Sequence, residues 1–398
     1  MGLKQNTWSL DQWYDQNVAG NVTYSGVGEA WVMGMNNNGN LGVNNTTQYS
    51  SPVQLPGTNW SSISIQNYQW PSFGLKTDGT LWSWGNNDDG MGGIDATGTN
   101  YSSPIQIPGT DWSRMRSGGY GGMATKTDGT LWMWGKGTQG NLAQNDRTNY
   151  SSPRQVPGTT WSNNFECGKW SSIAVKTDGT LWVWGYGGTR GALGQNEPGL
   201  IRYSSPVQIP GATWSTTANQ CDIGNDGAAC MKTDGSLWTW GNNEYGRAGN
   251  PSGPNEGYSS PVQVGSGTDW LNIACSGHNT MGVKTDGTFW AWGRNQYGEL
   301  GQGSASPSNA SFYEPVQVGS GTDWVKCHMF ADASFQGRSG VKTDGTLWAW
   351  GANDYGSLGQ NQGGTGEAYA YSSPVQVPGT GWKDPIYGEQ CSGAAKNL

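Results

Sequence analysis

Histidine and cysteine are the residue types that could bind a metal ion in this chain, and both are scarce. The two histidines, His278 and His328, lie 50 residues apart, and each follows a cysteine closely, Cys275 and Cys327 respectively. Two thiolates and two imidazoles could hold zinc, but structural zinc sites use ligand pairs at short fixed spacings, which this sequence lacks. The sequence therefore predicts no metal site, no cofactor, and a structural role for His278.

Carboxylates are the other candidates for chemistry. An aspartate precedes glycine in six copies of Lys-Thr-Asp-Gly, beginning with Asp78, and the run Asn86–Asp89 resembles a calcium loop. Turns explain the Asp-Gly pairs better, because the aspartate side chain can bond the local backbone. The Asn86–Asp89 run lacks the alternating ligands and terminal glutamate of an EF-hand, although a single loop cation stays open. No acid, base and nucleophile converge, so the sequence predicts a protein that is not an enzyme.

Charge and composition exclude two kinds of partner. The chain has 398 residues with 21 Lys and Arg against 29 Asp and Glu, a net charge of -8, and no basic stretch, so we expect no nucleic-acid binding. No apolar run of about twenty residues occurs, so we expect no membrane insertion. The opening segment lacks the apolar core of an ordinary secretory signal. The six cysteines have no paired spacing, which favours mostly reduced thiols in a core.

A repeat must position whatever site the chain carries. Lys-Thr-Asp-Gly, a short linker and Trp-x-Trp-Gly recur six times from Lys76 to Lys342, at spacings of 50, 50, 56, 52 and 58 residues. A block of the type Ser-Ser-Pro-Val-Gln occurs seven times, each time followed by a tryptophan, so the chain has seven units. Most of the 24 tryptophans lie at these positions. We interpret them as filling the gaps between units rather than as a light-absorbing array.

Each unit is typical of four short antiparallel strands. The second and third are joined by Asp-Gly, which predicts a type I′ hairpin turn, and the proline-flanked last strand suits a sheet edge. Seven such units indicate an all-β, seven-bladed β-propeller of four-stranded antiparallel blades. The isolated strand in Gly28–Gly34 and the C-terminal Ala394–Leu398 complement each other, so one blade is shared by both chain ends. We expect a propeller over 25–398 and an N-terminal extension, 1–24, that docks or caps.

One motif identifies the kind of propeller. The order of strand, Asp-Gly turn, Trp-x-Trp-Gly and G-x-N-x-x-G-x-L-G, most complete at Gly293–Gly301, resembles the regulator of chromosome condensation repeat, and the resemblance covers the chain from Gly28 onward. Members of that family include a nucleotide exchange factor on chromatin, a plant ultraviolet-B photoreceptor and a secreted inhibitor of β-lactamases, which implies that the loops decide the task. The opening segment is also similar to propeller proteins encoded by tailed phages of aquatic bacteria.

Strand direction predicts where a partner binds. The first-to-second and third-to-fourth connections share one face of the ring, and their lengths vary most: 14 to 18 residues from the tryptophan after each block to the repeated lysine, and 10 to 15 from the Leu-Gly glycine position to the next block. Aromatic and arginine anchors dominate binding interfaces, although several of these tyrosines could simply pack the loops. The candidate binding residues are Tyr68, Trp70, Tyr120, Trp170, Tyr186, Arg190, Tyr245, Arg247, Arg294, Tyr297, Phe335 and Tyr355.

These features together predict a recognition platform without catalytic activity. From the phage resemblance we expect a virion-associated or secreted adhesion or decoration protein that binds a protein or glycan through the variable loops, with possible docking to a larger assembly through residues 1–24. The alternative is an intracellular adaptor, or an inhibitor that blocks a partner enzyme with the same face. The expected location is the virion or the extracellular space, with the cytoplasm as the alternative.

Overall fold

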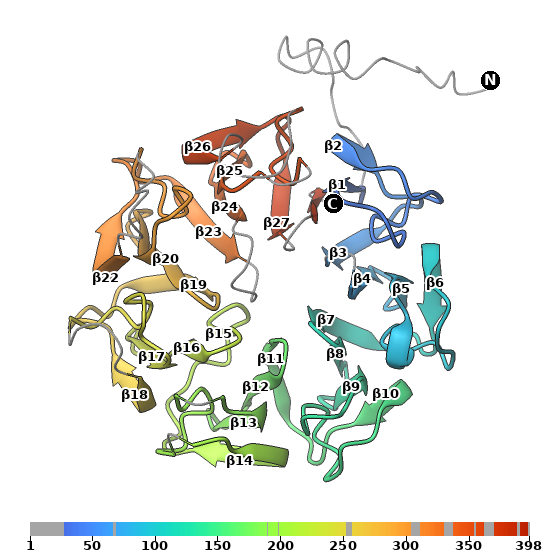
Figure 1. Ribbon diagram of the computed structural model, residues 1–398, viewed down its shortest axis with the longest axis horizontal. Coiled ribbons are helices and arrows are strands. Elements are labelled where there is room, and N and C mark those ends of the chain that lie inside the picture. The colour runs from blue at the N-terminus through green and yellow to red at the C-terminus, as the bar shows by residue number, and fades with distance from the viewer. Residues whose placement is uncertain are drawn as a thin grey trace.

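The computed structural model describes residues 28–66, 69–188, 190–197, 199–251, 257–303, 311–329, 337–353, 356–361, 370–387 and 391–396. These residues form seven four-stranded antiparallel sheets arranged around a central axis (Figure 1). The predicted all-β, seven-bladed β-propeller is therefore confirmed. The predicted N-terminal extension, 1–24, lies outside the described residues.

Six blades are built from consecutive strands, whose order along the chain runs from the innermost strand to the outermost. Blade 1 is β3 (Trp60–Ser64), β4 (Pro71–Lys76), β5 (Leu81–Gly85) and β6 (Tyr101–Ile107), with a short 3-10 helix η1 (Asp88–Gly90) between β5 and β6. Blade 2 is β7 (Trp112–Gly118), β8 (Gly121–Lys126), β9 (Leu131–Gly135) and β10 (Tyr150–Gln155). Blade 3 is β11 (Trp161–Cys167), β12 (Ser171–Lys176), β13 (Leu181–Tyr186) and β14 (Arg202–Ile209).

The other half of the ring follows the same order. Blade 4 is β15 (Cys221–Ile223), β16 (Gly227–Met231), β17 (Leu237–Gly241) and β18 (Tyr258–Gln263). Blade 5 is β19 (Trp270–Cys275), β20 (Asn279–Lys284), β21 (Phe289–Arg294) and β22 (Ser311–Gln317). Blade 6 is β23 (Trp324–Met329), β24 (Gly337–Lys342), β25 (Leu347–Gly351) and β26 (Tyr371–Val377). Blade 7 combines β27 (Trp382–Tyr387) and β28 (Cys391–Lys396) with β1 (Ala30–Gly34) and β2 (Tyr49–Gln54).

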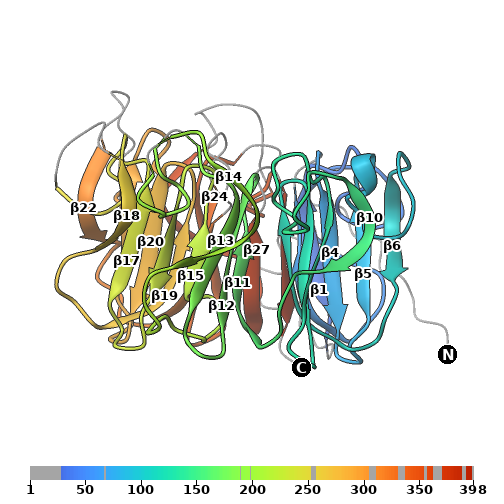
Figure 2. The ribbon, with the colours of Figure 1, turned by 90° about the horizontal axis from the view of Figure 1, so that it is seen from below.

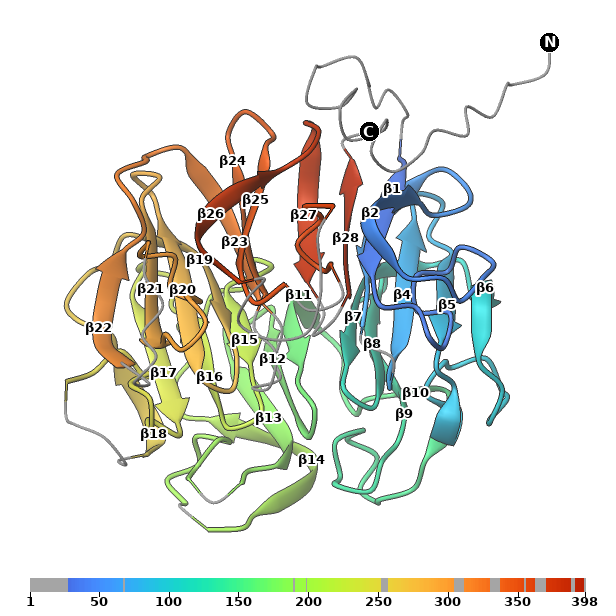
Figure 3. The same ribbon diagram turned by 45° about the horizontal axis from the view of Figure 1, so that its top comes forward.

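Blade 7 closes the ring with both ends of the chain, as predicted. β28 pairs with β1 in an antiparallel register that runs from Ala30 opposite Ala395 to Gly34 opposite Cys391. β28 also pairs with β27 on its other side, so it lies between the two halves of the blade (Figure 3). Closure leaves each blade with a neighbour on both sides, which protects its apolar surfaces from water.

The Asp-Gly hairpins differ in detail from the expected turn. Gly79 has a φ of 78°, but Asp78 does not share a positive φ, so the turn is not type I′. Instead the Gly79 N–H bonds the Lys76 carbonyl at 3.1 Å, and Asp78 Oδ1 accepts bonds from the Thr80 N–H at 2.9 Å and the Thr80 hydroxyl at 2.6 Å. The same aspartate cap recurs in all six copies, which confirms its role in the turn. These hydrogen bonds lower the pKa of Asp78.

Tryptophans fill the spaces between blades, as predicted. Trp60 and Trp84 of blade 1 pack in one buried cluster with Leu41 of blade 7. The Trp84 indole N–H donates to the Asn40 carbonyl of that neighbouring blade at 2.8 Å, and equivalent bonds recur in four further blades. The repeated lysine, such as Lys76, lies over two tryptophan rings of its own blade, so cation–π attraction explains why this position is a lysine.

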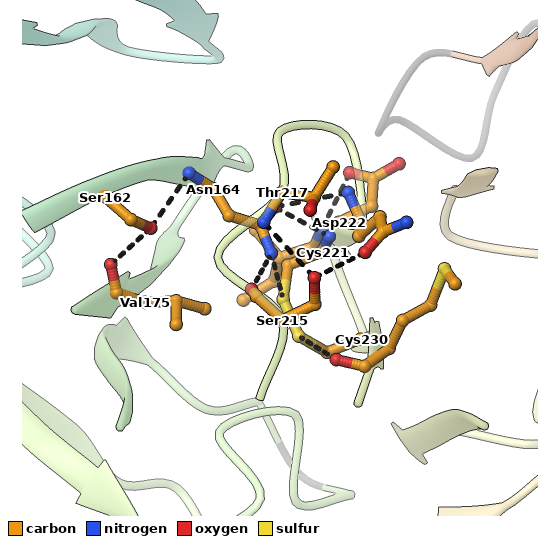
Figure 4. Close-up of a disulfide and its surroundings, with 11 residues drawn as sticks. Ser162, Asn164, Val175, Ser215, Thr217, Cys221, Asp222 and Cys230 are labelled. Atoms are coloured by element: carbon orange, nitrogen blue, oxygen red, sulfur yellow. Dashed lines mark hydrogen bonds between the residues drawn. A yellow bond between two sulfur atoms is a disulfide. The ribbon is translucent and has the colours of Figure 1, made fainter. Parts of the chain in front are cut away.

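The cysteines correct one prediction. Cys221 and Cys230 lie opposite each other on β15 and β16 with their Cα atoms 4.0 Å apart, and they form a disulfide (Figure 4). The expectation of reduced thiols is therefore wrong for this pair, because antiparallel pairing aligned two cysteines whose sequence separation showed no such spacing. Cys167, Cys275 and Cys327 are free and buried, as expected.

The two faces of the ring differ as strand direction predicts. The Asp-Gly hairpins and the crossovers between blades lie on one side, which we call the turn face, and the connections that include η1 lie on the other, which we call the loop face (Figure 2). The turn face repeats one hairpin geometry in six blades. The blades differ from one another in connections other than these hairpins.

Candidate functional site

Three predicted binding residues form one aromatic cluster on the loop face. Trp70, Tyr120 and Trp170 come from the first-to-second connections of blades 1, 2 and 3, each six residues before the repeated lysine. The Tyr120 ring lies 4.4 Å from the Trp170 ring and 6.3 Å from the Trp70 ring. Lys169 lies over Trp70 and Trp170, and Lys136 lies over Tyr120. Trp70 is buried, whereas Tyr120 and Trp170 are half-buried and face solvent in part.

A second group lies on the loop face at blades 4 and 5. The Tyr245 ring packs edge-on against the His278 ring at 4.6 Å. The Arg294 guanidinium lies over Tyr245 and Tyr297 and is 3.2 Å from Nδ1 of His278. His278 therefore packs among loop residues, in agreement with the predicted structural role. These side chains hold one another, which fits the alternative that several tyrosines pack the loops.

The remaining predicted anchors divide into three kinds. Arg247 is only 4% exposed and donates to the carbonyls of Asn242, Ser276 and Trp240, so it joins blades and its prediction as a binding anchor is corrected. Arg190 is partly exposed and bonds Asn242 at 2.6 Å, while Tyr186 lies under the guanidinium of Arg202. Three further predicted residues lie outside the described residues: Tyr68, Phe335 and Tyr355.

The axial channel is a second candidate site, which sequence reasoning missed. In blades 1 to 6, the second strand ends at the repeated lysine or directly before it. The residue three positions before that lysine pairs with one residue of the innermost strand, and this partner faces the channel. These positions form a ring around the channel: Ser64, Arg116, Glu166, Asp222, Ala274 and His328. A second ring, two residues earlier in four of the strands, holds Ser62, Arg114, Asn272 and Lys326. Part of the signal was in the sequence, because Ser64, Arg116 and His328 are polar residues that each lie four positions after the tryptophan that opens the unit.

A cavity of about 280 Å³ lies between these rings. Its most charged wall is on blades 2 and 3, where Arg116 Nε lies 2.7 Å from Glu166 Oε2. Arg114 donates to Oδ1 of Asn219 at 2.7 Å, and Arg116 donates to the same oxygen. Asn219 belongs to blade 4, so its side chain reaches past blade 3 to meet both guanidiniums.

Asn219 lies in a segment that corrects part of the loop-face argument. The long interval from Trp214 to Lys232 was expected to lengthen the first-to-second connection. Instead the extra residues lie within 215–220, before a shortened β15, and Ala218 and Asn219 of this segment line the channel. Buried Asn164 of blade 3 anchors this segment, because its Oδ1 accepts from the Cys221 N–H at 3.0 Å and its Nδ2 donates to the Ser215 carbonyl at 2.6 Å (Figure 4).

The carboxyl group of Asp222 has an altered acidity in this cavity. Burial first, and then the negative charge of Glu166, raise the pKa of Asp222 well above its ordinary value, to about 8. The N–H groups of Cys275 and Ile223, each 2.7 Å from an Asp222 oxygen, and the positive charge of Arg116 oppose this shift. Asp222 therefore keeps its proton to a higher pH than an ordinary aspartate does.

Neither metal nor thiol chemistry is supported by the described residues. His278 lies on the loop face and His328 in the channel, and among the described residues no group of three or more His, Cys, Asp and Glu side chains could hold a metal ion. Burial raises the pKa of the Cys167, Cys275 and Cys327 thiols, so they are protonated and poor nucleophiles. No described helix is long and apolar enough to cross a membrane.

Two family models match the repeat. The model for the Regulator of chromosome condensation (RCC1) repeat matches residues 128–175, 234–283, 286–329 and 344–391, and a second model of that repeat matches 270–299. The first match begins in the Asp-Gly turn of blade 2 and ends in β12 of blade 3. Each sequence repeat thus supplies the outer half of one blade and the inner half of the next, which ties neighbouring blades together covalently.

Relatives match over part of their length. The chain is 31% identical to Protein RCC2 homolog of Danio rerio over 180 residues, which are 43% of this chain and 32% of that protein. It is 30% identical to the E3 ubiquitin-protein ligase HERC2 of Mus musculus over 142 residues, 35% of this chain and 3% of that protein. The chain thus spans well under half the length of these curated relatives.

Solved structures match the whole ring. Prp20p from Saccharomyces cerevisiae superimposes with a TM-score of 0.78 at 16% identity, covering 100% of this chain and 96% of the yeast chain. Human WBSCR16 gives a TM-score of 0.74 at 17% identity over 93% of this chain and 98% of the human one. At such identities these likenesses concern the fold alone. The chain is therefore a seven-bladed β-propeller, and four of its segments match the regulator of chromosome condensation repeat.

Proposed function

We propose that this propeller binds a protein partner through its loop face and does so without catalysis, as an adaptor or as an inhibitor of that partner. The support from relatives is general. One crystal structure shows yeast Prp20 bound to Kap60, and another was reported together with the binding of Prp20p to Gsp1p and histones. None of the matched proteins supports the expected virion-associated or adhesion role, or a glycan ligand, and they favour the intracellular alternative. The location of the protein stays a prediction.

The aromatic cluster of Trp70, Tyr120 and Trp170 is the observation that carries this proposal. Three adjacent blades contribute one ring each, so the surface is continuous across two blade boundaries. The buried Trp70 supports the half-buried Tyr120 and Trp170, which gives them fixed positions before any partner arrives. Rigid aromatic side chains are the usual anchors of protein interfaces because they bury a large area at a low entropic cost.

The charges around the cluster indicate the chemistry of the partner surface. Lys136 and Lys169 lie over the aromatic rings and are held there by cation–π contacts. Lys136 also pairs with Asp89 at 2.9 Å. A partner segment that combines an aromatic or aliphatic side chain with carboxylates would satisfy both rings and cations.

Affinity capture with matched variants tests this function. The tagged full chain and its Tyr120→Ala/Trp170→Ala variant are used to capture proteins from extracts of the source cells, and the dissociation constant of the captured partner is then measured. Leu271→Ala is the control, because Leu271 is 39% exposed and follows Trp270 at the turn-face end of β19. We expect the double variant to weaken binding at least about a hundredfold, as for loss of two anchors, while the control binds normally. A partner that binds both variants equally would rule out the aromatic cluster as the site.

A further inference from the structure

We propose that the axial cavity binds a small oxyanion, of the phosphate or carboxylate type, at the point where Arg114 and Arg116 converge. Both side chains project from β7 toward the channel, because residues two apart on a strand share a face. Both donate to one neutral acceptor, Asn219 Oδ1. Two guanidiniums directed at a single oxygen form the arrangement that recognises an oxyanion.

Asn219 occupies the position that a ligand oxygen would take. Its backbone is fixed, because the Asn272 side-chain amide donates to the Asn219 main-chain carbonyl at 3.0 Å and Asn164 holds the adjoining Cys221 N–H. A bound oxyanion would therefore displace only the side-chain amide of Asn219. The segment that carries it, 215–220, contains four more residues than the equivalent stretch of blade 1, and no other described innermost strand has an insertion of this length. The site is therefore a feature of this blade and does not follow from the repeat.

The charge of the cavity favours an anion although the chain as a whole is acidic. The described side chains that line it include three cations, Arg114, Arg116 and Lys326, and two acids, Glu166 and Asp222. Glu166 is committed to Arg116 by the 2.7 Å ion pair. The three positive charges of these five groups therefore outnumber the two negative ones even when both acids are ionised.

The size of the cavity selects a small molecule over a macromolecule. A volume of about 280 Å³ is close to the lower end of the range for small-molecule pockets, roughly 300 to 1,000 Å³. The innermost strands of six blades contribute to the wall, so the ligand is surrounded laterally by backbone and has no room for a protein segment. Inorganic phosphate and succinate are therefore suitable probes.

Calorimetric titration of the full chain with each probe, at pH 7 and constant ionic strength, tests the proposal. We expect saturable binding of at least one probe by the unaltered protein. Arg114→Gln/Arg116→Gln should lower its affinity at least about tenfold, since hydrogen bonds to charged groups are lost. The control Arg154→Gln/Arg202→Gln removes the same charge from the outer strands β10 and β14 and should bind the probe normally.

A second variant separates binding from folding. Asn219→Asp places a carboxylate where the oxyanion would bind, while both arginines stay in place. It should abolish probe binding and leave the melting temperature unchanged or higher, because the new carboxylate pairs with the guanidiniums. Failure of the unaltered protein to bind either probe saturably would overturn the proposal. So would equal binding by the Asn219→Asp variant, or an equal loss of affinity in the outer-strand control.

Discussion

The substitution Asp222→Asn tests whether the channel holds an uncharged carboxyl group at neutral pH. Burial and the neighbouring Glu166 raise the pKa of Asp222 to about 8, against the opposing effects of Arg116 and of the Cys275 and Ile223 N–H groups. In the unfolded chain the group returns to its ordinary pKa, about 3.9. The two states therefore bind different numbers of protons over the interval between these two pKa values.

The sign of the effect follows from that difference. Below about pH 4 both states are protonated at Asp222, and the stability associated with its protonation is fully present. Between about pH 4 and pH 8 the folded protein keeps a proton that the unfolded chain has released. The free energy of unfolding should then fall by about 1.4 kcal/mol for each pH unit, and the loss is complete once pH rises through the folded pKa. Asparagine does not titrate, so the variant should lack this contribution.

Equilibrium urea unfolding at pH 5, 6 and 7 measures the effect. The variant loses an acceptor, because Asn offers one oxygen where Asp222 accepts the Ile223 and Cys275 N–H bonds, so its stability is lower by a constant amount. The slope, rather than this offset, is the readout: relative to the unaltered protein, the variant should gain about 1.4 kcal/mol per pH unit.

Asp178→Asn serves as the control for that experiment. The hydrogen bonds from Thr180 lower the pKa of Asp178, so it is ionised in both states from pH 5 to pH 7 and contributes no slope there. The readout is the difference in stability between the Asp222→Asn variant and the unaltered protein. If this difference does not change with pH, or changes in the opposite direction, Asp222 is not protonated in the folded protein.

Three further predictions concern the architecture. Deleting residues 391–398 removes β28, which pairs with both β27 and β1. The deletion should lower the free energy of unfolding by several kcal/mol, at about 1 kcal/mol per ladder bond, and should cause aggregation through the exposed strand edges. An unchanged melting midpoint with a monomeric profile would contradict ring closure. In the denatured protein, Cys221 and Cys230 should resist alkylation until a reductant is added, and mass spectrometry that finds both labelled without reduction would exclude the disulfide. Trp184→Phe removes the 3.0 Å bond to the Asn141 carbonyl of the next blade and should lower the free energy of unfolding by about 1 to 3 kcal/mol, measured by urea unfolding; equal stability would show that ring packing alone joins the blades.

The repeat made the fold predictable. Each unit carries its own turn residues and its own tryptophans, so local sequence specifies each blade independently of the others. The count of seven and the sharing of blade 7 followed from the unmatched pieces at the two chain ends, and the pairing of Ala30 with Ala395 confirms them. The turn geometry could not be predicted in detail. An Asp-Gly pair allows a type I′ turn, but it equally allows the turn observed here, in which Asp78 has a negative φ and its side chain accepts a hydrogen bond from the Thr80 N–H.

The candidate sites were predictable only in part. Trp70, Tyr120 and Trp170 were identified as possible anchors because they are aromatic residues in the variable connections, but their contact with one another depends on the ring bringing three blades together. Arg247 showed the limit of that approach, because residue type alone does not distinguish an exposed anchor from an arginine buried against the carbonyls of the neighbouring blade.

The sequence by itself determined the strands, the hairpins, the order of the blades and the face on which the connections vary, since all of these depend on contacts within one unit or between consecutive units. Only the tertiary structure decided which residues meet across the axis. Arg114 and Asn219 are 105 residues apart, and Cys221 joins Cys230 through strand pairing. The acidity of Asp222 likewise comes from groups on four blades. Closing the chain into a ring places such residues together, and because that closure is a property of all seven blades, no local pattern records it.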